Sequence, residues 1–161
     1  MKERIKALFI TPLGRTASTA APLAAAIGLC PIVIEDLAEV RLGDFEGGEY
    51  RLRRARGDPV VQRVFESERW DEIPGAESPE SLEVRVRAGM EAIRAGTGAD
   101  AAAVAVLLGG VIGEICRQTT SSRLYAFLHC DNGSITRVVF LRGDRCWLRS
   151  FATKPLTCRR E

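Results

Sequence analysis

A pair of glycines in the second half of the chain is the first candidate for contact with an anion. Gly109-Gly110 follows an all-apolar run and precedes a stretch with helical periodicity. Glycines let backbone N–H groups come close to a ligand, and the start of a helix favours negative charge. The spacing matches neither the dinucleotide-binding fingerprint nor the phosphate-binding loop that ends in Lys and Ser or Thr. A tight turn that lets a helix pack closely on a sheet is the commoner reason for such a pair.

Two charged residues earlier in the chain could act on the same kind of ligand. Arg15 follows a short apolar run and stands at the start of an alanine-rich stretch, where a guanidinium can bind a phosphate through paired N–H groups. Glu39 lies among apolar residues, where partial burial would favour the protonated form that a general acid needs. An exposed arginine and a solvated or ion-paired glutamate are the alternatives that each residue alone leaves open.

Histidine and cysteine are too scarce for several kinds of site. His129 is the only histidine, and the five cysteines include no Cys-x-x-Cys pair. We therefore expect no bound metal and no cofactor. The first residues show no signal-peptide pattern, which together with the odd number of scattered cysteines predicts free thiols and a cytoplasmic location.

Charge and length limit the classes of partner. Lys and Arg number 23 and Asp and Glu number 21, which leaves a formal net charge of +2. A balance so close to zero argues against a nucleic-acid binder and against a polybasic membrane binder. The longest apolar run, residues 101–108, is too short to cross a bilayer. A length of 161 residues predicts one domain over 1–161.

Apolar runs and helical periodicity alternate along the chain, which predicts an α/β sandwich. The clearest helix begins after Ser78, a good N-cap, with Pro79 in the first helical position, and ends at Gly96. Residues 41–49 carry three glycines without a clear period and predict a loop. The other expected elements are strands at 7–10, 31–34 and 101–108, helices at 16–27, 48–56, 58–66 and 111–119, and a C-terminal β-hairpin of 134–141 and 146–151 around a turn at 142–145.

Five motifs surround the candidate residues and occur in a consistent order. They are Thr-Pro-Leu-Gly-Arg-Thr at 11–16, Leu-Ala-Glu-Val-Arg-Leu-Gly-Asp-Phe-Glu-Gly at 37–47, Pro-Gly-Ala-Glu-Ser at 74–78, Gly-Gly-Val-Ile at 109–112 and Asp-Asn-Gly-Ser-Ile-Thr at 131–136. From about residue 7 to 151 this order resembles the histidine phosphatase superfamily, the phosphoglycerate mutase-like proteins. The resemblance implies a three-layer α/β sandwich with a mostly parallel central sheet and a C-terminal β-hairpin.

The resemblance also implies a specific chemistry for the site. In that family a histidine of an Arg-His-Gly motif attacks a phosphoryl group, and a second histidine just before the Gly-Gly turn helps to hold it. An arginine that matches Arg15 binds the phosphate, and a glutamate that matches Glu39 is the general acid or base. The transferred phosphoryl group carries charge on three oxygens, which positive groups and aimed donors must stabilise. The expected phosphate site comprises Arg15, Gly109 and Gly110.

This chain departs from the pattern at both histidines. No Arg-His-Gly occurs, and the strand that carries it in the family has no counterpart before residue 7. Leu108 stands where the family has its second histidine, and leucine can neither donate to a phosphate oxygen nor carry charge. His129 falls where the family has no catalytic residue, so we do not expect it to be a nucleophile.

These departures leave three functions open. The first is a catalytically inactive domain with weak binding of inorganic phosphate or a phosphorylated small molecule. The second is a phosphomonoester hydrolase, acting through phosphohistidine, whose nucleophile segment lies outside this chain. The third is a non-enzymatic interaction module.

The resemblance carries one more expectation, about the sheet. It places the missing strand beside both 7–10 and 101–108, which would leave unpaired edges on both runs, so we expect the chain either to shift its strands and close the gap or to self-associate through it.

Overall fold

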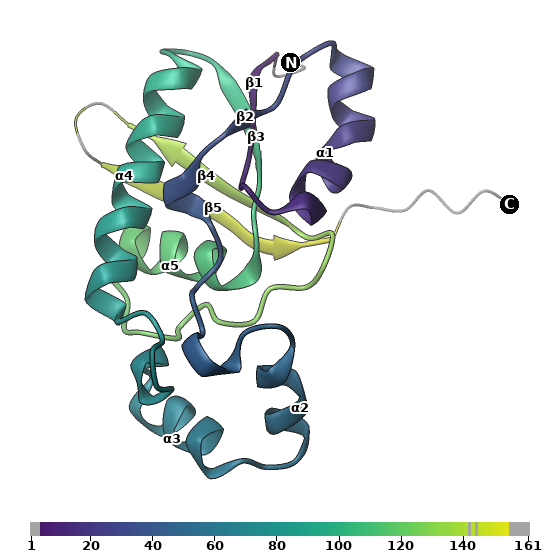
Figure 1. The fold of residues 1–161 in the computed structure, drawn as a ribbon. Coiled ribbons are helices and arrows are strands. Elements are labelled where there is room, and N and C mark those ends of the chain that lie inside the picture. The colour runs from purple at the N-terminus through teal and green to yellow at the C-terminus, as the bar shows by residue number, and fades with distance from the viewer. Residues whose placement is uncertain (1–3, 142, 144, 155–161) are drawn as a thin grey trace, which may run out of the picture.

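The computed structural model describes residues 4–141, 143 and 145–154, and its centre is a parallel sheet of three strands. The strand order is β2 (Ile32–Val33), β1 (Ile5–Ile10) and β3 (Ala102–Val106). Helix α1 (Gly14–Ile27) covers one face of this sheet and helix α4 (Pro79–Thr97) covers the other (Figure 1). The predicted α/β sandwich is therefore confirmed.

Strand β1 is buried on both faces, which explains its uninterrupted apolar sequence. Ala7 and Phe9 belong to the larger core cluster, which includes residues of α4 and of helix α5 (Gly109–Thr120), whereas Leu8 and Ile10 pack with Ala20 of α1. Successive side chains of a strand point to opposite faces, so a strand between two helical layers needs apolar residues at every position.

The expected gap between the first and third strands is absent. Residues of β1 pair directly with β3 in parallel register, from Ala7 opposite Ala103 to Ile10 opposite Val106. The expectation that a missing strand separates these two runs is therefore wrong. The strand is also shorter than the predicted 101–108, and its residues are half-buried rather than enclosed, because no further strand pairs with its outer edge among the described residues.

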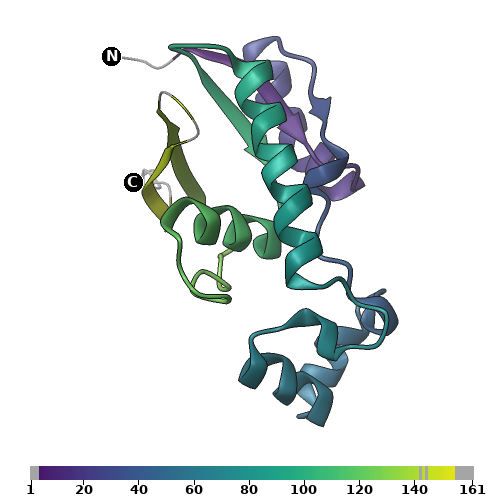
Figure 2. The ribbon, with the colours of Figure 1, turned by 90° about the vertical axis from the view of Figure 1, so that its left-hand side faces the viewer.

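A C-terminal hairpin of β4 (Ile135–Phe140) and β5 (Cys146–Thr153) forms a second, antiparallel sheet, which confirms the predicted hairpin. Figure 2 shows this hairpin standing apart from β3. It is attached to the rest of the molecule through helix α5 (Gly109–Thr120), which contacts both strands. Of the predicted turn, residues 142 and 144 lie outside the described residues.

The segment between β2 and α4 includes a small lobe that lies below the sheet in Figure 1. Its helices are α2 (Glu49–Ala55) and α3 (Pro59–Ser67), close to the predicted 48–56 and 58–66. The predicted loop at 41–49 contains a short 3-10 helix, η2 (Gly43–Phe45), whose Phe45 is buried in the main core cluster.

The long helix α4 begins as its sequence predicts but ends later. The Ser78 hydroxyl accepts a hydrogen bond from the Ser81 N–H at 3.2 Å and caps the helix. The helix runs on to Thr97 and is capped by Gly98, whose N–H donates to the Arg94 carbonyl. Gly96 lies inside it and faces the ring of Phe9, where a Cβ would lie 3.0 Å from the nearest ring atom. Close packing, not helix termination, accounts for this glycine.

Within the described residues no helix is long and apolar enough to span a membrane.

Candidate anion-binding site

Helices α1 and α5 both start at the edge of the sheet where β1 and β3 end, the lower edge in Figure 1. The fold thus brings the two predicted phosphate-binding segments to one edge, as parallel strands require. Arg15 lies in the first turn of α1 and is exposed. Its guanidinium makes no hydrogen bond or ion pair with any described residue, so it is free to meet a ligand. The turn before it is fixed by the Thr16 hydroxyl, which lies 2.7 Å from the Leu13 carbonyl.

The carboxylate of Glu39 occupies the first turn of α5. Its Oε2 accepts a hydrogen bond from the Gly110 N–H at 3.3 Å, and its Oε1 accepts from the Val111 N–H at 3.2 Å. Oε1 also accepts from the N–H of the next residue, Val40, at 2.9 Å. The first N–H groups of a helix have no partner within the helix, and this end of the helix dipole favours negative charge. Leu108, the N-cap residue, offers no side-chain cap, so Glu39 supplies the cap from a distant segment.

The second glycine of the pair is required by this contact. A Cβ on Gly110 would lie 2.6 Å from Glu39 Oε1 and 2.8 Å from a methyl carbon of Val40. A Cβ on Gly109 would meet only the Cβ of Cys130, at an ordinary 3.9 Å. The pair was predicted as a turn ahead of a helix at 111–119, but both glycines lie inside the helix. The group that accepts from the Gly110 and Val111 N–H groups is the protein's own carboxylate.

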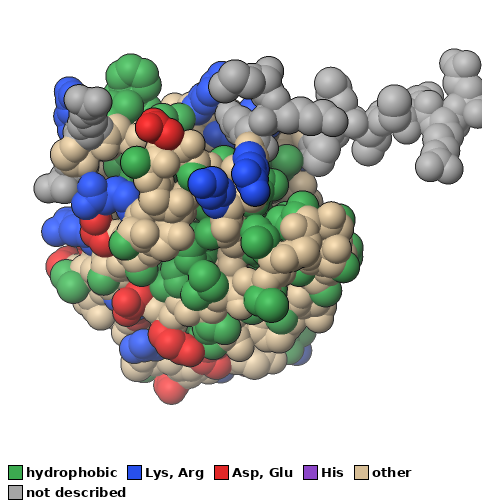
Figure 3. Space-filling view, turned by 90° about the horizontal axis from the view of Figure 1, so that it is seen from above, with side chains coloured by type: hydrophobic (Ala, Val, Ile, Leu, Met, Phe, Trp, Pro, Cys, Tyr) green, Lys and Arg blue, Asp and Glu red, His purple; other side chains and the backbone are tan. Residues whose placement is uncertain are grey.

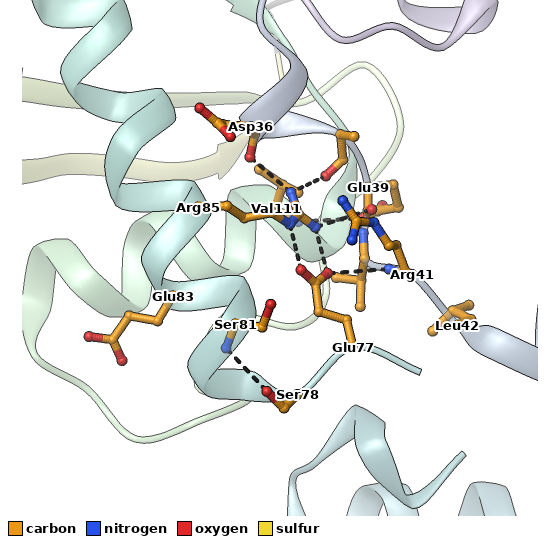
Figure 4. Close-up of polar contacts among 12 residues, drawn as sticks. Asp36, Glu39, Arg41, Leu42, Glu77, Ser78, Ser81, Glu83, Arg85 and Val111 are labelled. Atoms are coloured by element: carbon orange, nitrogen blue, oxygen red, sulfur yellow. Dashed lines mark hydrogen bonds and ion pairs between the residues drawn. The ribbon is translucent and has the colours of Figure 1, made fainter. Parts of the chain in front are cut away.

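A buried ion pair holds the segment that carries Glu39 (Figure 4). Arg85 of α4 binds Glu77 through two parallel hydrogen bonds, Nε to Oε1 at 2.6 Å and Nη2 to Oε2 at 2.7 Å. The side chains are only 11% and 2% exposed. Burial acts to raise the pKa of Glu77, but the hydrogen bonds and charge of Arg85 outweigh it and hold that pKa below its ordinary value. The carboxylate is therefore ionised at neutral pH.

The same guanidinium also donates to three backbone carbonyls of the Glu39 segment. Arg85 Nη1 donates to the Ala38 carbonyl at 2.6 Å and to the Asp36 carbonyl at 2.9 Å, and Nη2 donates to the Glu39 carbonyl at 3.2 Å. Glu77 in turn accepts from the Arg41 N–H at 3.4 Å. Together, Arg85 and Glu77 tie residues 36–41 to α4, and we call this pair the Arg85–Glu77 clamp.

The remaining predicted residues do not join the site. His129 is exposed, and its side chain makes no hydrogen bond or ion pair with a described residue. Leu108 is half-buried and has no polar group to offer. Among the described residues no cluster of His, Cys, Asp and Glu is arranged to hold a metal ion.

The clamp was not predicted, although the sequence contains a signal for it. Glu77 lies in the Pro-Gly-Ala-Glu-Ser motif at 74–78, which by itself indicates no role for this side chain. Arg85 stands next to Val86, within the helical face that also contains the buried Leu82. An arginine beside the apolar face of a helix must find an acidic partner or carbonyls, and this rule could have singled it out.

A small cavity of about 30 Å³ adjoins the start of α5, between that helix and the lobe. Gly110 lines it together with Trp70 and Tyr125. The Tyr125 hydroxyl is buried and has no hydrogen-bond partner among the described residues. Burial raises the pKa of Tyr125. A larger cavity, about 590 Å³, lies between α4, α5 and the hairpin, and neither Arg15 nor Glu39 lines it.

Comparison with solved structures places this fold among phosphatases and mutases. The mycobacterial glucosyl-3-phosphoglycerate phosphatase matches with a TM-score of 0.77 at 21% identity, over 95% of this chain and 79% of that chain. The phosphoglycerate mutase from Bacillus anthracis matches with a TM-score of 0.75 at 19% identity, over 94% of this chain and 74% of that chain. The mycobacterial phosphatase in complex with VO3 gives 0.76 at 22% identity, over 94% and 78%. At these identities the likeness shows the phosphoglycerate mutase-like fold alone.

The family model of the histidine phosphatase superfamily (branch 1) matches residues 1–153. The chain belongs to this superfamily, and the resemblance drawn from its motifs is confirmed. No curated protein sequence matches the chain.

Proposed function

We propose that this chain is a non-catalytic member of the histidine phosphatase superfamily that binds phosphate or a phosphorylated small molecule weakly. The binding groups are Arg15 and the first turn of α5. The observation that carries the proposal is the position of Glu39, whose carboxylate accepts hydrogen bonds from the Gly110 and Val111 N–H groups. A general acid or base must be able to reach a substrate, whereas this carboxylate is engaged as a helix cap.

The residue types at the site support the absence of turnover. Phosphohistidine chemistry needs an imidazole at the site, and the only histidine of the chain, His129, is exposed and takes no part in it. Leu108, directly before the glycine pair, offers neither a donor nor a charge for a phosphoryl oxygen. The mycobacterial relative was solved with VO3, a phosphate-like ligand, and this supports the ligand class proposed here.

A phosphatase assay tests the loss of catalysis. The purified chain is expected to release no phosphate from a generic aryl phosphate above background between about pH 5 and pH 8, since removing residues that act as a unit costs orders of magnitude in rate. Turnover that scales with protein concentration and disappears in Glu39→Gln would overturn the proposal.

Thermal unfolding tests the remaining binding. Phosphate is expected to bind in the millimolar range, about −4 kcal/mol, and to raise the melting temperature slightly. Arg15→Ala should abolish this shift, and Arg4→Ala, an exposed arginine ahead of β1, is the matched control that should keep it. An equal shift in Arg15→Ala would mean that phosphate acts elsewhere or as a general salt.

The hydrolase function with a nucleophile segment outside this chain remains the second candidate. It is favoured by one comparison, since the chain spans 74% to 79% of the phosphatase and mutase chains named above. Phosphatase activity that appears only when a longer polypeptide is expressed would select it.

The interaction-module function rests on a different observation, the outer edge of β3, which pairs with no other described strand. Co-purification of a stoichiometric partner would select it. For each of these functions we propose a cytoplasmic location, supported by the free thiols of the four cysteines that the structure describes.

A further inference from the structure

Glu39 and an outside anion would compete for the same N–H groups, those of Gly110 and Val111. The outcome depends on how firmly the main chain of Glu39 is held in place. The carboxylate reaches α5 from a segment with little regular structure, because η1 (Glu35–Leu37) is a single 3-10 turn and residues 38–41 after it belong to no helix or strand. A short segment of this kind fixes its side chains poorly unless another element holds its backbone. That element is α4, which contacts η1 closely.

Two contacts hold residues 36–39 against α4. Arg85 donates to the carbonyls of Asp36, Ala38 and Glu39, so three peptide groups in four residues share one guanidinium. Gly89, one turn further along α4, leaves room for Leu37, since a Cβ there would lie 2.5 Å from the Leu37 side chain. Leu37 is fully buried. The guanidinium cannot move to satisfy other groups, because its remaining donors are bound to the buried carboxylate of Glu77.

We infer that Arg85 is a positioning residue that holds Glu39 at the start of α5 and thereby weakens the binding of outside anions there. The inference rests on the proposed function, since it concerns the same anion site. A carboxylate whose main chain is already fixed loses little entropy when it binds the Gly110 and Val111 N–H groups. An outside anion must displace it, so its apparent affinity falls by the fraction of molecules in which the N–H groups are free.

The inference predicts that loosening Arg85 has opposite effects on stability and on anion affinity. Arg85→Lys keeps the positive charge beside Glu77 but replaces a rigid fork of donors by a single ammonium, which cannot hold all three carbonyls. The variant should melt at a lower temperature and yet bind phosphate about threefold more tightly than the wild-type chain. A residue with a purely structural role would lower both quantities together. Glu39→Ala, which removes the competing carboxylate, should tighten binding by about tenfold.

A double-variant cycle makes the dependence on Glu39 explicit. In the Glu39→Ala background, Arg85→Lys should no longer change phosphate affinity, because no carboxylate remains to be positioned. The matched control is Arg87→Lys, the same substitution two residues along α4, at a side chain that is 65% exposed and pairs with Glu83. Phosphate affinity of this control should equal that of the wild-type chain. An equal gain from Arg85→Lys with and without Glu39, or no gain in either, would overturn the inference.

Amide NMR provides a readout that does not depend on phosphate. Glu39→Gln should produce shifts in the Gly110 and Val111 amide resonances, because it replaces the carboxylate that accepts from both N–H groups. Arg85→Lys should reduce their amplitude, and Arg87→Lys should not. If phosphate binds neither the wild-type chain nor Glu39→Ala, the proposed function fails, and the amide shifts still decide the inference. Amide shifts of full amplitude in Arg85→Lys would overturn the inference even where phosphate binds.

Discussion

At the scale of single residues, the carboxylate of Glu39 accepts hydrogen bonds from the first N–H groups of α5, where the helix dipole favours negative charge. The family resemblance predicts a general acid or base at Glu39, whereas in the structure its oxygens accept hydrogen bonds from α5. The neighbouring Leu108 offers no competing polar group, and Arg15 lies exposed at the same edge of the sheet. The proposed site thus combines the exposed guanidinium of Arg15 with N–H groups of α5 that Glu39 already caps.

The glycine pair allows a sharp test of that cap. Gly110→Ala places a methyl group against Glu39 Oε1 and Val40, so the carboxylate must leave the first turn of α5. We expect a loss of about 1 to 2 kcal/mol in the free energy of unfolding, the usual cost of a lost N-cap. Gly109→Ala is the control, because its Cβ has ordinary room, and it should stay within about 0.5 kcal/mol of the wild-type chain. Urea denaturation measures both, and equal stabilities for the two variants would contradict the cap.

A second prediction at the scale of single residues concerns Tyr125, where a substitution is expected to raise the free energy of unfolding rather than lower it. Its hydroxyl is buried without a partner among the described residues, so the native state bears an uncompensated desolvation cost. Tyr125→Phe removes that hydroxyl and keeps the ring contacts with Trp70 and Phe65. We expect the free energy of unfolding to rise by about 1 kcal/mol. A clear loss of stability would show that the hydroxyl has a partner, such as an ordered water in the adjoining cavity.

At the scale of elements, the parts that local sequence determines were predictable. Ser78 and Pro79 identify the start of α4 because capping and proline geometry act within one turn. The pairing of β3 with β1 could not be predicted, because pairing between strands that are distant in sequence depends on the whole fold and not on the apolar sequence of either strand. For the same reason the sequence indicated Glu39 and Gly110 separately but not their contact, which joins residues 71 positions apart.

The Arg85–Glu77 clamp, which ties α4 to residues 36–41, predicts a dependence of stability on pH. Arg85 holds the pKa of Glu77 below its ordinary value in the folded chain, so the pair stabilises the fold above the unfolded-state pKa. This contribution is lost as the pH falls through the folded-state pKa. The free energy of unfolding should therefore drop between about pH 5 and pH 3, and the drop should be smaller in Glu77→Gln. Glu91→Gln, at an exposed glutamate of the same helix, is the control that should keep the wild-type slope.

At the scale of the whole molecule, the sheet and the hairpin remain separate, and both keep unpaired edges. Strand β3 pairs only with β1, and β4 pairs only with β5, among the described strands. Figure 3 shows hydrophobic side chains gathered in the middle of the face seen from above, with basic and acidic side chains around them. Trp147 of the hairpin is 66% exposed. An unpaired strand edge is a template for pairing with another chain.

We predict that the chain self-associates through the outer edge of β3. Backbone groups of this edge have no strand partner among the described residues, the five residues of β3 are apolar and half-buried, and a net charge of +2 gives little electrostatic protection. Sedimentation velocity at micromolar concentration should show a dimer or a larger species whose share rises with concentration. Trp147→Lys is the control for the hairpin, and it should leave the association unchanged, because the residue lies outside β3. Conversion to monomer by Trp147→Lys would move the contact to the hairpin, and a compact wild-type monomer at every concentration would show that the edge of β3 is not an interface.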